Sequence, residues 1–326
     1  MNELVPSGLR VAVTGATGDI GRSLLRALER ESAVREVVAM ARRAFDPAEL
    51  GLAKTEYRRG DVLDRVAVEE LVRGANVVVH LAYLTVGGRE ETERLNLDGS
   101  RTVFEVAVAA GAARLLSAQR RSPRTPKATL EPALHEVATD GATQSYVFRP
   151  GIVAGADALT PLKNIPYVQL FELLRGHENP LTAAVLDWAQ RFPNLKPVLP
   201  DPGARFQLVH HDDVAAAFAA AVLGRGEPGL YDLAASPPLS VSELAAELGW
   251  LSFPIPQTAL DSAAELVERL PLRPGQAQWI EMLRQPVLMD STQAREQLSW
   301  APQHDARDTL TEMARTAREQ GLLDLG

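Results

Sequence analysis

The fold is decided near the N-terminus, where residues 9–21 read LRVAVTGATGDIG. A short apolar run, Leu9–Thr14, leads directly into three glycines, Gly15, Gly18 and Gly21. A helix that begins at such a turn presents free N–H groups and the positive end of its dipole to an anion. The order of strand, glycine triplet and amphipathic helix therefore predicts a dinucleotide-binding βαβ unit. The alternative is a loop with chance glycines, which gives no reason for that order.

Each glycine has its own expected role. Gly15 permits the tight turn, Gly18 lets the backbone approach a pyrophosphate, and Gly21 allows close packing of helix on strand. The helix that follows has one apolar stripe, in which isoleucine and leucine side chains recur every four residues. Loop and helix residues expected to contact the cofactor are Gly15, Thr17, Gly18, Asp19, Ile20, Gly21 and Arg22.

Short apolar runs alternate with amphipathic stretches over the first 150 residues. The predicted strands are Leu9–Thr14, Glu36–Met40, Thr55–Arg58, Val77–Leu81, Arg114–Ser117 and Ser145–Arg149. Alternation of this kind predicts an α/β fold, a Rossmann-type doubly wound parallel sheet with a smaller, mostly C-terminal substrate lobe. We expect the nucleotide-binding domain at residues 1–155, with 206–235 returning to it, and the substrate lobe at 156–205 and 236–326.

Composition excludes several classes of function. A net charge of −8 over 326 residues leaves no basic excess for a nucleic-acid backbone. The chain has no cysteine, and its six histidines include one adjacent pair, His210-His211, without metal-site spacing, so no metal is expected. No apolar run is long enough for a membrane span, which favours a cytoplasmic protein. We expect it to be a monomer or a homodimer.

Five later segments, together with the GxxGxxG spacing, resemble the short-chain dehydrogenase/reductase (SDR) superfamily in its extended type. They are Gly60-Asp61-Val62, His80-Leu81-Ala82-Tyr83, Asn96-Leu97-Asp98-Gly99, Arg149-Pro150-Gly151-Ile152-Val153 and LVHHDDV at 208–214. The resemblance implies that Asp61 and Val62 contact the adenine. It also implies that Leu81 and Ala82 lie beside the nicotinamide ribose, and that Pro150, Ile152 and Val153 hold the carboxamide. The histidines and aspartates of 210–213 are interpreted as packing and hinge residues.

The cofactor predicted from the sequence is NADP(H). NAD-specific folds place an acid at the tip of the second strand, where it accepts hydrogen bonds from the ribose 2′-OH. Here that tip carries Arg42 and Arg43 and no acid, and Arg22 follows the glycine loop. Guanidinium groups favour a 2′-phosphate, although solvated surface arginines are the alternative.

The catalytic tyrosine of the family has no counterpart at its expected position. The family uses a serine or threonine followed by YxxxK. Lys127 and Glu131 align with its KxxxE pattern, which places Pro123 where the tyrosine belongs. Between Tyr83 and Tyr146 the sequence contains no tyrosine at all.

Three residues are the remaining catalytic candidates. The resemblance implies Lys127 as a ribose-binding residue, with a surface lysine as the alternative, and Ser117 as the family's serine. Tyr83 either donates a proton or walls the pocket, and the wall is favoured. Loss of a general acid costs roughly 10²–10⁴-fold in rate, so a substrate that carries its own acidic hydroxyl is still reduced.

The aromatic residues of the second lobe indicate a flat, apolar ligand, although a small-lobe core is the alternative interpretation. They are Trp188, Phe192, Phe253 and Trp279, with Met282. The favoured hypothesis is an NADPH-dependent ketoreductase acting on a bulky aromatic ketone, as the resemblance to tyrosine-less reductases of polyketide antibiotic biosynthesis implies. A non-catalytic NADP(H) sensor is the second hypothesis. A sugar-nucleotide epimerase or dehydratase is less favoured, because those reactions also need the tyrosine.

Overall fold

The computed structural model describes residues 8–83, 89–119, 134, 142–165, 168, 196–258 and 288–323. The chain divides into two compact units. Unit 1 comprises Met1–Gly151, His211–Ala234 and Asp290–Gln303, and unit 2 comprises Ile152–His210, Ala235–Met289 and His304–Gly326.

Unit 1 is built on a seven-stranded sheet in which every neighbouring pair is parallel. The strand order is β11-β6-β5-β4-β1-β2-β3. The strands are β1 (Leu9–Thr14), β2 (Val34–Ala41), β3 (Thr55–Arg59), β4 (Val77–His80), β5 (Arg114–Ala118), β6 (Gln144–Pro150) and β11 (Gly229–Leu233). The Rossmann-type α/β fold predicted from the sequence is confirmed.

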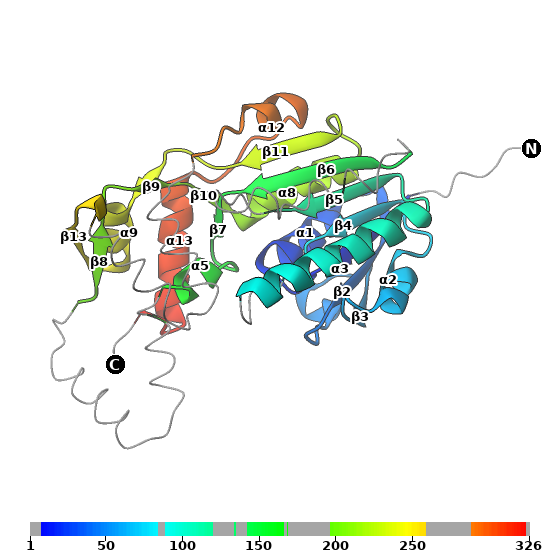
Figure 1. The fold of residues 1–326 in the computed structure, drawn as a ribbon, viewed down its shortest axis with the longest axis horizontal. Helices are drawn as coiled ribbons and strands as arrows, with labels where there is room; N and C mark the ends of the chain where they lie inside the picture. The colour runs from blue at the N-terminus through cyan, green and yellow to red at the C-terminus, as the bar shows by residue number, and fades with distance from the viewer. Residues whose placement is uncertain are drawn as a thin grey trace, which may run out of the picture. The chain divides into compact units, whose positions relative to one another are not determined.

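Helices cover both faces of this sheet (Figure 1). They are α1 (Asp19–Arg30), α2 (Arg65–Val72), α3 (Arg89–Ala109), α8 (His211–Val222) and, beside β11, α12 (Thr292–Gln297), with the short 3₁₀ helix η1 (Pro47–Leu50) after β2. Helices α2 and α3 bury apolar side chains against one face, in a cluster that includes Val78, Phe104 and Leu115. Helices α1 and α8 pack together, and α8 also contacts β5 and β6. Helices thus shield both faces of the central strands from solvent, which explains why these strands are continuous apolar runs in the sequence.

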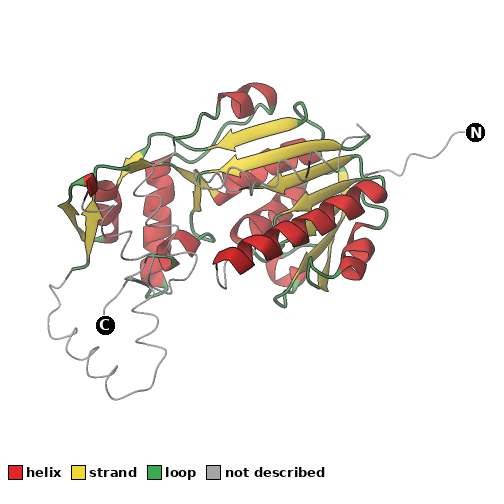
Figure 2. Cartoon of the chain, in the orientation of Figure 1, coloured by secondary structure: helices red, strands yellow, loops and turns green. Residues whose placement is uncertain are grey.

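Unit 2 has its own apolar core, which is built from short elements. They are β7 (Ile152–Ala154), α5 (Thr160–Lys163), β8 (Val198–Asp201), β9 (Arg205–Phe206), β10 (Leu208–His210), β12 (Leu239–Ser240), α9 (Val241–Leu248), β13 (Leu251–Pro254) and α13 (Ala306–Glu319). Three two-stranded sheets pair β10 with β7, β12 with β9, and β13 with β8. Figure 2 shows these strands as short yellow arrows beside helices α9 and α13.

The parallel sheet fixes where a ligand can bind in unit 1. All seven carboxyl ends meet at one edge. From β1, the strands β2 and β3 are added on one side of the sheet and β4, β5 and β6 on the other, so the strand order reverses between β1 and β4. Open α/β sheets bind ligands at this point of reversal, outside the carboxyl ends of the strands. Among the helices that the structure describes, none is long and apolar enough to cross a bilayer.

Candidate functional site

The glycine loop lies at the carboxyl end of β1, next to the point of reversal. Gly15 has φ +74°, and its N–H donates to the Met40 carbonyl oxygen at 2.9 Å, which ties the loop to β2. A Cβ at Gly15 would lie 2.5 Å from the Leu81 carbonyl carbon and 2.6 Å from Ala82 N. Only glycine therefore lets the end of β4 approach so closely, and the tight turn expected at Gly15 is present.

Gly18 and Gly21 differ in their surroundings. A Cβ at Gly21 would clash with the Gly15 carbonyl oxygen and lie 2.8 Å from the Ala16 carbonyl, so Gly21 permits the close packing of α1 on the loop. At Gly18 the nearest atom to such a Cβ is the Gly15 oxygen at 3.3 Å, and the space beyond is open. Gly18 is the N-cap of α1 and makes no side-chain cap, so no capping side chain stands between the N-terminus of the helix and a bound anion.

Arginine side chains gather where β2 and β3 end. The guanidinium of Arg43 donates to the Thr17 carbonyl oxygen at 2.8 Å, which places it at the rim of the glycine loop. Arg42 is exposed, and its carbonyl oxygen accepts from Arg59 Nε at 2.9 Å. In α1, Arg22 has a buried Nε without a hydrogen-bond partner in the described part of the chain. The three predicted arginines thus lie on the elements around the loop. Arg59, which was not predicted, lies beside Arg42.

The segment expected to contact the adenine follows β3. Asp61 Oδ1 accepts from Leu63 N at 3.1 Å, so this carboxylate also shapes its own loop. Val62 packs against α3 at Gly99, where a Cβ would lie 2.8 Å from Val62 Cγ2. The glycine of the Asn96–Gly99 segment therefore has a packing role, because it lets α3 approach the loop that carries Asp61.

A layer of buried polar side chains closes the apolar core below the carboxyl ends of the central strands. His80 Nδ1 shares a hydrogen bond of 2.8 Å with Thr14 Oγ1, and His80 Nε2 shares one of 2.8 Å with Ser100 Oγ of α3. Thr14 Oγ1 in turn accepts from Ala82 N at 3.4 Å. Burial lowers the pKa of His80 to about 4, so its ring is neutral at physiological pH. The network joins β1, β4 and α3 at the expected nicotinamide side.

Two further members of this layer lie on β5 and just after it, and each has a buried side-chain atom without a hydrogen-bond partner in the part of the chain that the structure describes. Ser117 pairs in register with His80 of β4 and is completely buried. Gln119 is 7% exposed, and its backbone N–H donates to the Phe148 carbonyl oxygen at 2.8 Å. Neither Ser117 Oγ nor Gln119 Nε2 has a hydrogen-bond partner within the described residues. Such buried orphan groups are costly, so a ligand that satisfies them is expected.

The remaining residues of the expected nicotinamide side fall in both units. Leu81 follows β4 with its N–H donating to the Thr14 carbonyl oxygen at 3.1 Å, and Tyr83 is 49% exposed. Pro150 ends β6 in unit 1, whereas Ile152 and Val153 belong to β7 of unit 2.

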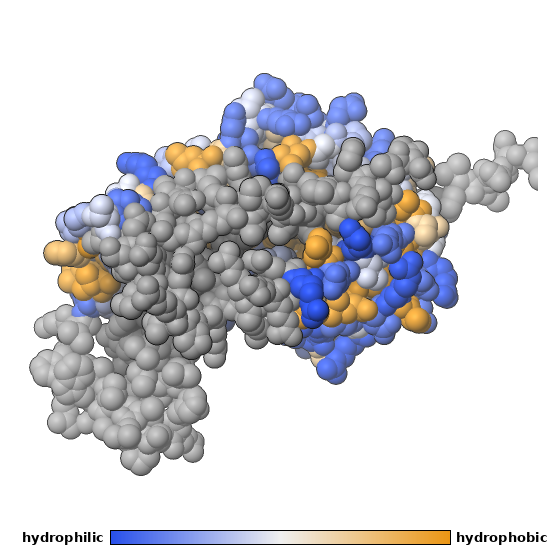
Figure 3. Space-filling model, in the orientation of Figure 1, coloured by the Kyte–Doolittle hydropathy of each residue, from blue (hydrophilic) through white to orange (hydrophobic). Residues whose placement is uncertain are grey.

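Several predicted residues lie outside the described part of the chain. These are Lys127, Glu131 and the tyrosine-equivalent Pro123, together with Trp188, Phe192, Trp279 and Met282. Phe253 is described and is 62% exposed on β13. With Val198 and Leu251 it forms an apolar patch over β8 and β13, which Figure 3 shows in orange. The expectation that Phe253 lines a substrate cleft stays a prediction.

The residues at 211–213 make structural contacts. Ser23 Oγ of α1 and His211 Nδ1 of α8 are 2.7 Å apart and buried. Asp213 Oδ1 accepts from Gln303 N at 2.8 Å, and its carbonyl oxygen accepts from Trp300 Nε1 at 2.8 Å. The interpretation of these residues as packing groups agrees with these bonds.

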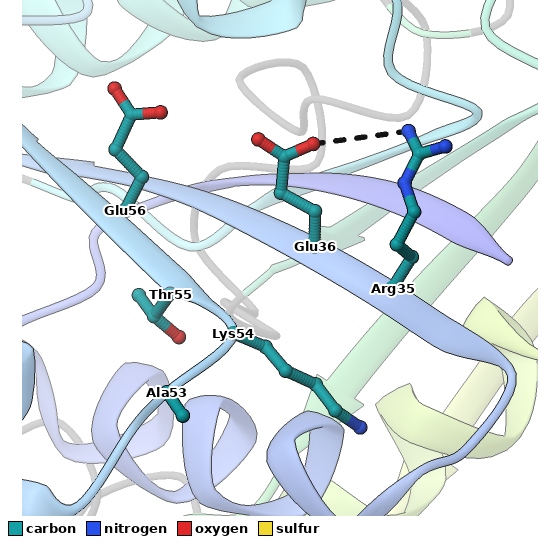
Figure 4. Close-up of a pocket in the computed structure, with 6 residues that line it drawn as sticks. All are labelled: Arg35, Glu36, Ala53, Lys54, Thr55 and Glu56. Atoms are coloured by element: carbon teal, nitrogen blue, oxygen red, sulfur yellow. Dashed lines mark ion pairs between the residues drawn. The ribbon is translucent and has the colours of Figure 1, made fainter.

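One open pocket lies at the other edge of the sheet. It has a volume of about 600 Å³ and is lined by Arg35, Glu36, Ala53, Lys54, Thr55 and Glu56 (Figure 4). These residues stand at the amino ends of β2 and β3, opposite the glycine loop. The lining carries two carboxylates and no glycine cradle, so the pocket does not fit a dinucleotide.

Comparison with known proteins agrees with this geometry. Residues 11–120 match the NAD dependent epimerase/dehydratase family. Rv2047c, an uncharacterized protein of Mycobacterium tuberculosis, is 27% identical over 98% of this chain, and the chain spans about a third (31%) of that protein. A ceramide reductase of Caulobacter vibrioides is 31% identical over 63% of this chain and 58% of its own length.

A solved structure extends the likeness in fold. A UDP-glucose 4-epimerase of Thermotoga maritima superposes with a TM-score of 0.66 at 18% identity, covering 96% of this chain and 99% of the epimerase. The family match spans the glycine loop and the strands from β1 to β5, whereas β6 and β11 lie beyond it. Over residues 11–120 the chain is therefore similar to the NAD dependent epimerase/dehydratase family, and its motifs resemble the extended SDR type.

Proposed function

We propose that this protein is an NADPH-dependent ketoreductase that reduces a carbonyl of a bulky, aromatic substrate. The observation that carries the proposal is the edge of unit 1, where an open glycine cradle and orphaned buried donors lie along the carboxyl ends of neighbouring strands. A bound nicotinamide cofactor supplies the hydride in such a reaction. The protein supplies orientation, hydrogen bonds and exclusion of water.

The residues present fit a phosphorylated dinucleotide. The space above Gly18 and the N-terminus of α1 suit the pyrophosphate, which the helix dipole attracts. Arg43 at the loop rim and Arg42 beside it suit a 2′-phosphate, and the buried, unpartnered Nε of Arg22 is a further donor. A carboxylate at the tip of β2 would favour the unphosphorylated ribose, and this tip carries arginines instead.

The reductive direction and the substrate are finer parts of the proposal. The similarity to a ceramide reductase supports reduction of a carbonyl. An aromatic polyketide is proposed because this sequence resembles the angucyclinone ketoreductase of simocyclinone biosynthesis in two features, the missing tyrosine and the arginine-rich composition. The epimerase of similar fold supports a sugar-nucleotide reaction less strongly, since that chemistry relies on the tyrosine that this sequence lacks between Tyr83 and Tyr146.

The proton has to come from the substrate or from water if no tyrosine donates it. A phenol beside a ketone, or a quinone that tautomerises, brings an acid within hydrogen-bonding reach. Reduction then needs the protein mainly to hold carbonyl and cofactor in line, an effect worth several orders of magnitude in rate. Tyr83, which is half exposed after β4, is proposed as part of the pocket wall.

The test is direct. The purified protein is mixed with NADPH and with ortho-hydroxyacetophenone, ortho-methoxyacetophenone and menadione, and the absorbance of NADPH is followed. The proposal expects oxidation with the phenolic ketone or the quinone, and loss of turnover without loss of binding when the phenol is methylated. Tight NADPH binding without any oxidation across a wide panel of carbonyls would point to the sensor hypothesis instead.

A further inference from the structure

The side-chain amide of Gln119 is a buried hydrogen-bond donor close to the carboxyl end of β5. Its amide is buried, with 7% of the residue exposed, yet its Nε2 donates to no atom in the part of the chain that the structure describes. A native protein rarely leaves a buried NH₂ group unpaired, because the lost hydration is not repaid. Ser117, two residues earlier, shows the same deficit at its hydroxyl.

These two side chains lie on one face of the same extended segment. Residues two apart in a strand point to the same side, and the bond from Gln119 N to Phe148 O continues the β5–β6 ladder by one residue. Leu115, two residues before Ser117, belongs to the core under α2 and α3, which fixes that face. The orphan donors thus run along β5 toward the carboxyl edge of the sheet.

The position along the sheet selects the half of the cofactor that lies nearby. The glycine loop and the arginines stand on β1 and β2, on one side of the point of reversal, whereas Gln119 stands after β5, two strands to the other side of β1. A dinucleotide that crosses this point brings its nicotinamide to the β4–β5 side. A reacting carbonyl must lie against that ring.

We propose that the Gln119 amide donates a hydrogen bond to the oxygen of the substrate carbonyl, in the role for which the family's tyrosine has no counterpart here. A bound NADPH would supply hydride to the carbonyl carbon, and the π pair of the C=O bond would shift to the oxygen. Gln119 stabilises that developing charge and remains neutral, and the proton comes from the substrate's phenol or from water. The inference rests on the proposed ketoreductase function.

The substitution that tests it is Gln119→Leu, which removes both donors and keeps a side chain of similar length. Thr55→Val is the matched control, because Thr55 Oγ1 is also buried without a partner in the described residues, but lies at the amino end of β3. For each variant three quantities are measured: kcat and KM with ortho-hydroxyacetophenone or, if it is reduced faster, menadione; the Kd for NADPH; and the melting temperature.

Gln119→Leu is expected to lower kcat about 10²–10³-fold, the usual effect of losing one donor to a developing oxyanion. The Kd for NADPH should stay within about twofold, and the melting temperature should stay level or rise, because an unpaired polar group has been removed. Thr55→Val should leave kcat unchanged. This pattern separates loss of transition-state stabilisation from loss of folding.

Other outcomes overturn the inference. Unchanged kcat in Gln119→Leu would show that its amide does not meet the reacting oxygen. A rise in the Kd for NADPH equal to the fall in turnover would assign the amide to the cofactor instead. If the unmodified protein fails to oxidise NADPH with any of the carbonyl probes, the proposed function itself fails, and the inference falls with it. The rate of the wild type thus distinguishes the two failures.

Discussion

Gly15 and Gly18 sit three residues apart in one loop, yet a methyl group has opposite consequences at the two positions. At Gly15 the backbone is left-handed and the new Cβ would overlap the Leu81–Ala82 backbone, so Gly15→Ala should cost roughly 3 kcal/mol of stability. At Gly18 the new Cβ would meet only the Gly15 carbonyl oxygen, at 3.3 Å, so Gly18→Ala should lower the melting temperature far less than Gly15→Ala and weaken dinucleotide binding about tenfold. Thermal unfolding and cofactor titration check both. Equal effects of the two substitutions on stability would contradict this assignment of the open space to the cofactor.

His80 gives unit 1 a pH-dependent stability. Burial lowers its pKa to about 4, below the value near 6.5 of an unfolded histidine. Between those values the unfolded chain binds the proton and the folded chain does not, so stability falls as pH drops from about 6.5 to 4. The loss attributable to His80 approaches about 3 kcal/mol at the lower end.

The difference between the wild type and His80→Gln isolates this contribution. Urea unfolding is measured at intervals between pH 7 and pH 4.5 for both proteins. The wild type should lose stability more steeply than the variant, although the variant starts lower because it weakens the bonds to Thr14 and Ser100. Parallel curves would mean that another group carries the acid sensitivity.

At this scale the sequence predicted residues whose role depends on local order, and it missed those whose role depends on burial. The glycines follow from a turn between strand and helix, and Arg43 follows from its place after a strand. Gln119 and Arg59 have no such local signal. The structure draws attention to them because it buries the Gln119 amide without a partner among the described residues and brings Arg59 beside Arg42.

Among the elements, the strands of the first 150 residues could be predicted from the sequence, because strands that are covered on both faces consist of apolar residues. Val11–Val13 and Val77–Val79 are buried on either side, so each strand reads as an unbroken apolar run. The predicted start of β2 at Glu36 was two residues late, since Val34 pairs with Leu9 and the exposed Arg35 lies at an irregularity between this pair and the pair of Arg10 with Glu36. The two-residue strands β9 and β12 lack any periodic signal, because pairing between them is set by the fold of unit 2.

The tips of β2 and β3 carry the prediction on cofactor choice. Arg43→Ala removes the guanidinium at the loop rim and should weaken NADPH binding about tenfold, with a much smaller effect on NADH. Arg35→Ala is the matched control, because Arg35 is exposed at the opposite end of the same strand. Titrations with both dinucleotides check it. An equal loss for NADPH and NADH in Arg43→Ala would assign the side chain to shaping the loop alone.

The whole molecule combines segments that are distant in the chain. Helix α8 and strand β11, from His211–Ala234, extend the sheet of unit 1, and β11 pairs with β6 in register from Gly229↔Tyr146 onward. The ion pair between Arg149 Nε and Asp232 Oδ1 at 2.8 Å ties these two strands together. Such returns are hard to derive from sequence, because an Ala-rich helix and a short strand carry no information on which strand they will join.

Hydrogen exchange with and without NADPH tests which segments of each unit the cofactor protects. A ligand at 100 times its Kd stabilises the folded state by about 2.7 kcal/mol, so amides that open by global unfolding of unit 1 should slow accordingly. The strongest local protection is expected at residues 15–22, and a smaller gain at Ile152 and Val153, the segment expected to hold the carboxamide. The buried face of α13 lies in the core of unit 2 and serves as the internal reference. Protection confined to unit 1 would remove Ile152 and Val153 from the site, and protection absent from residues 15–22 would contradict dinucleotide binding at the glycine loop.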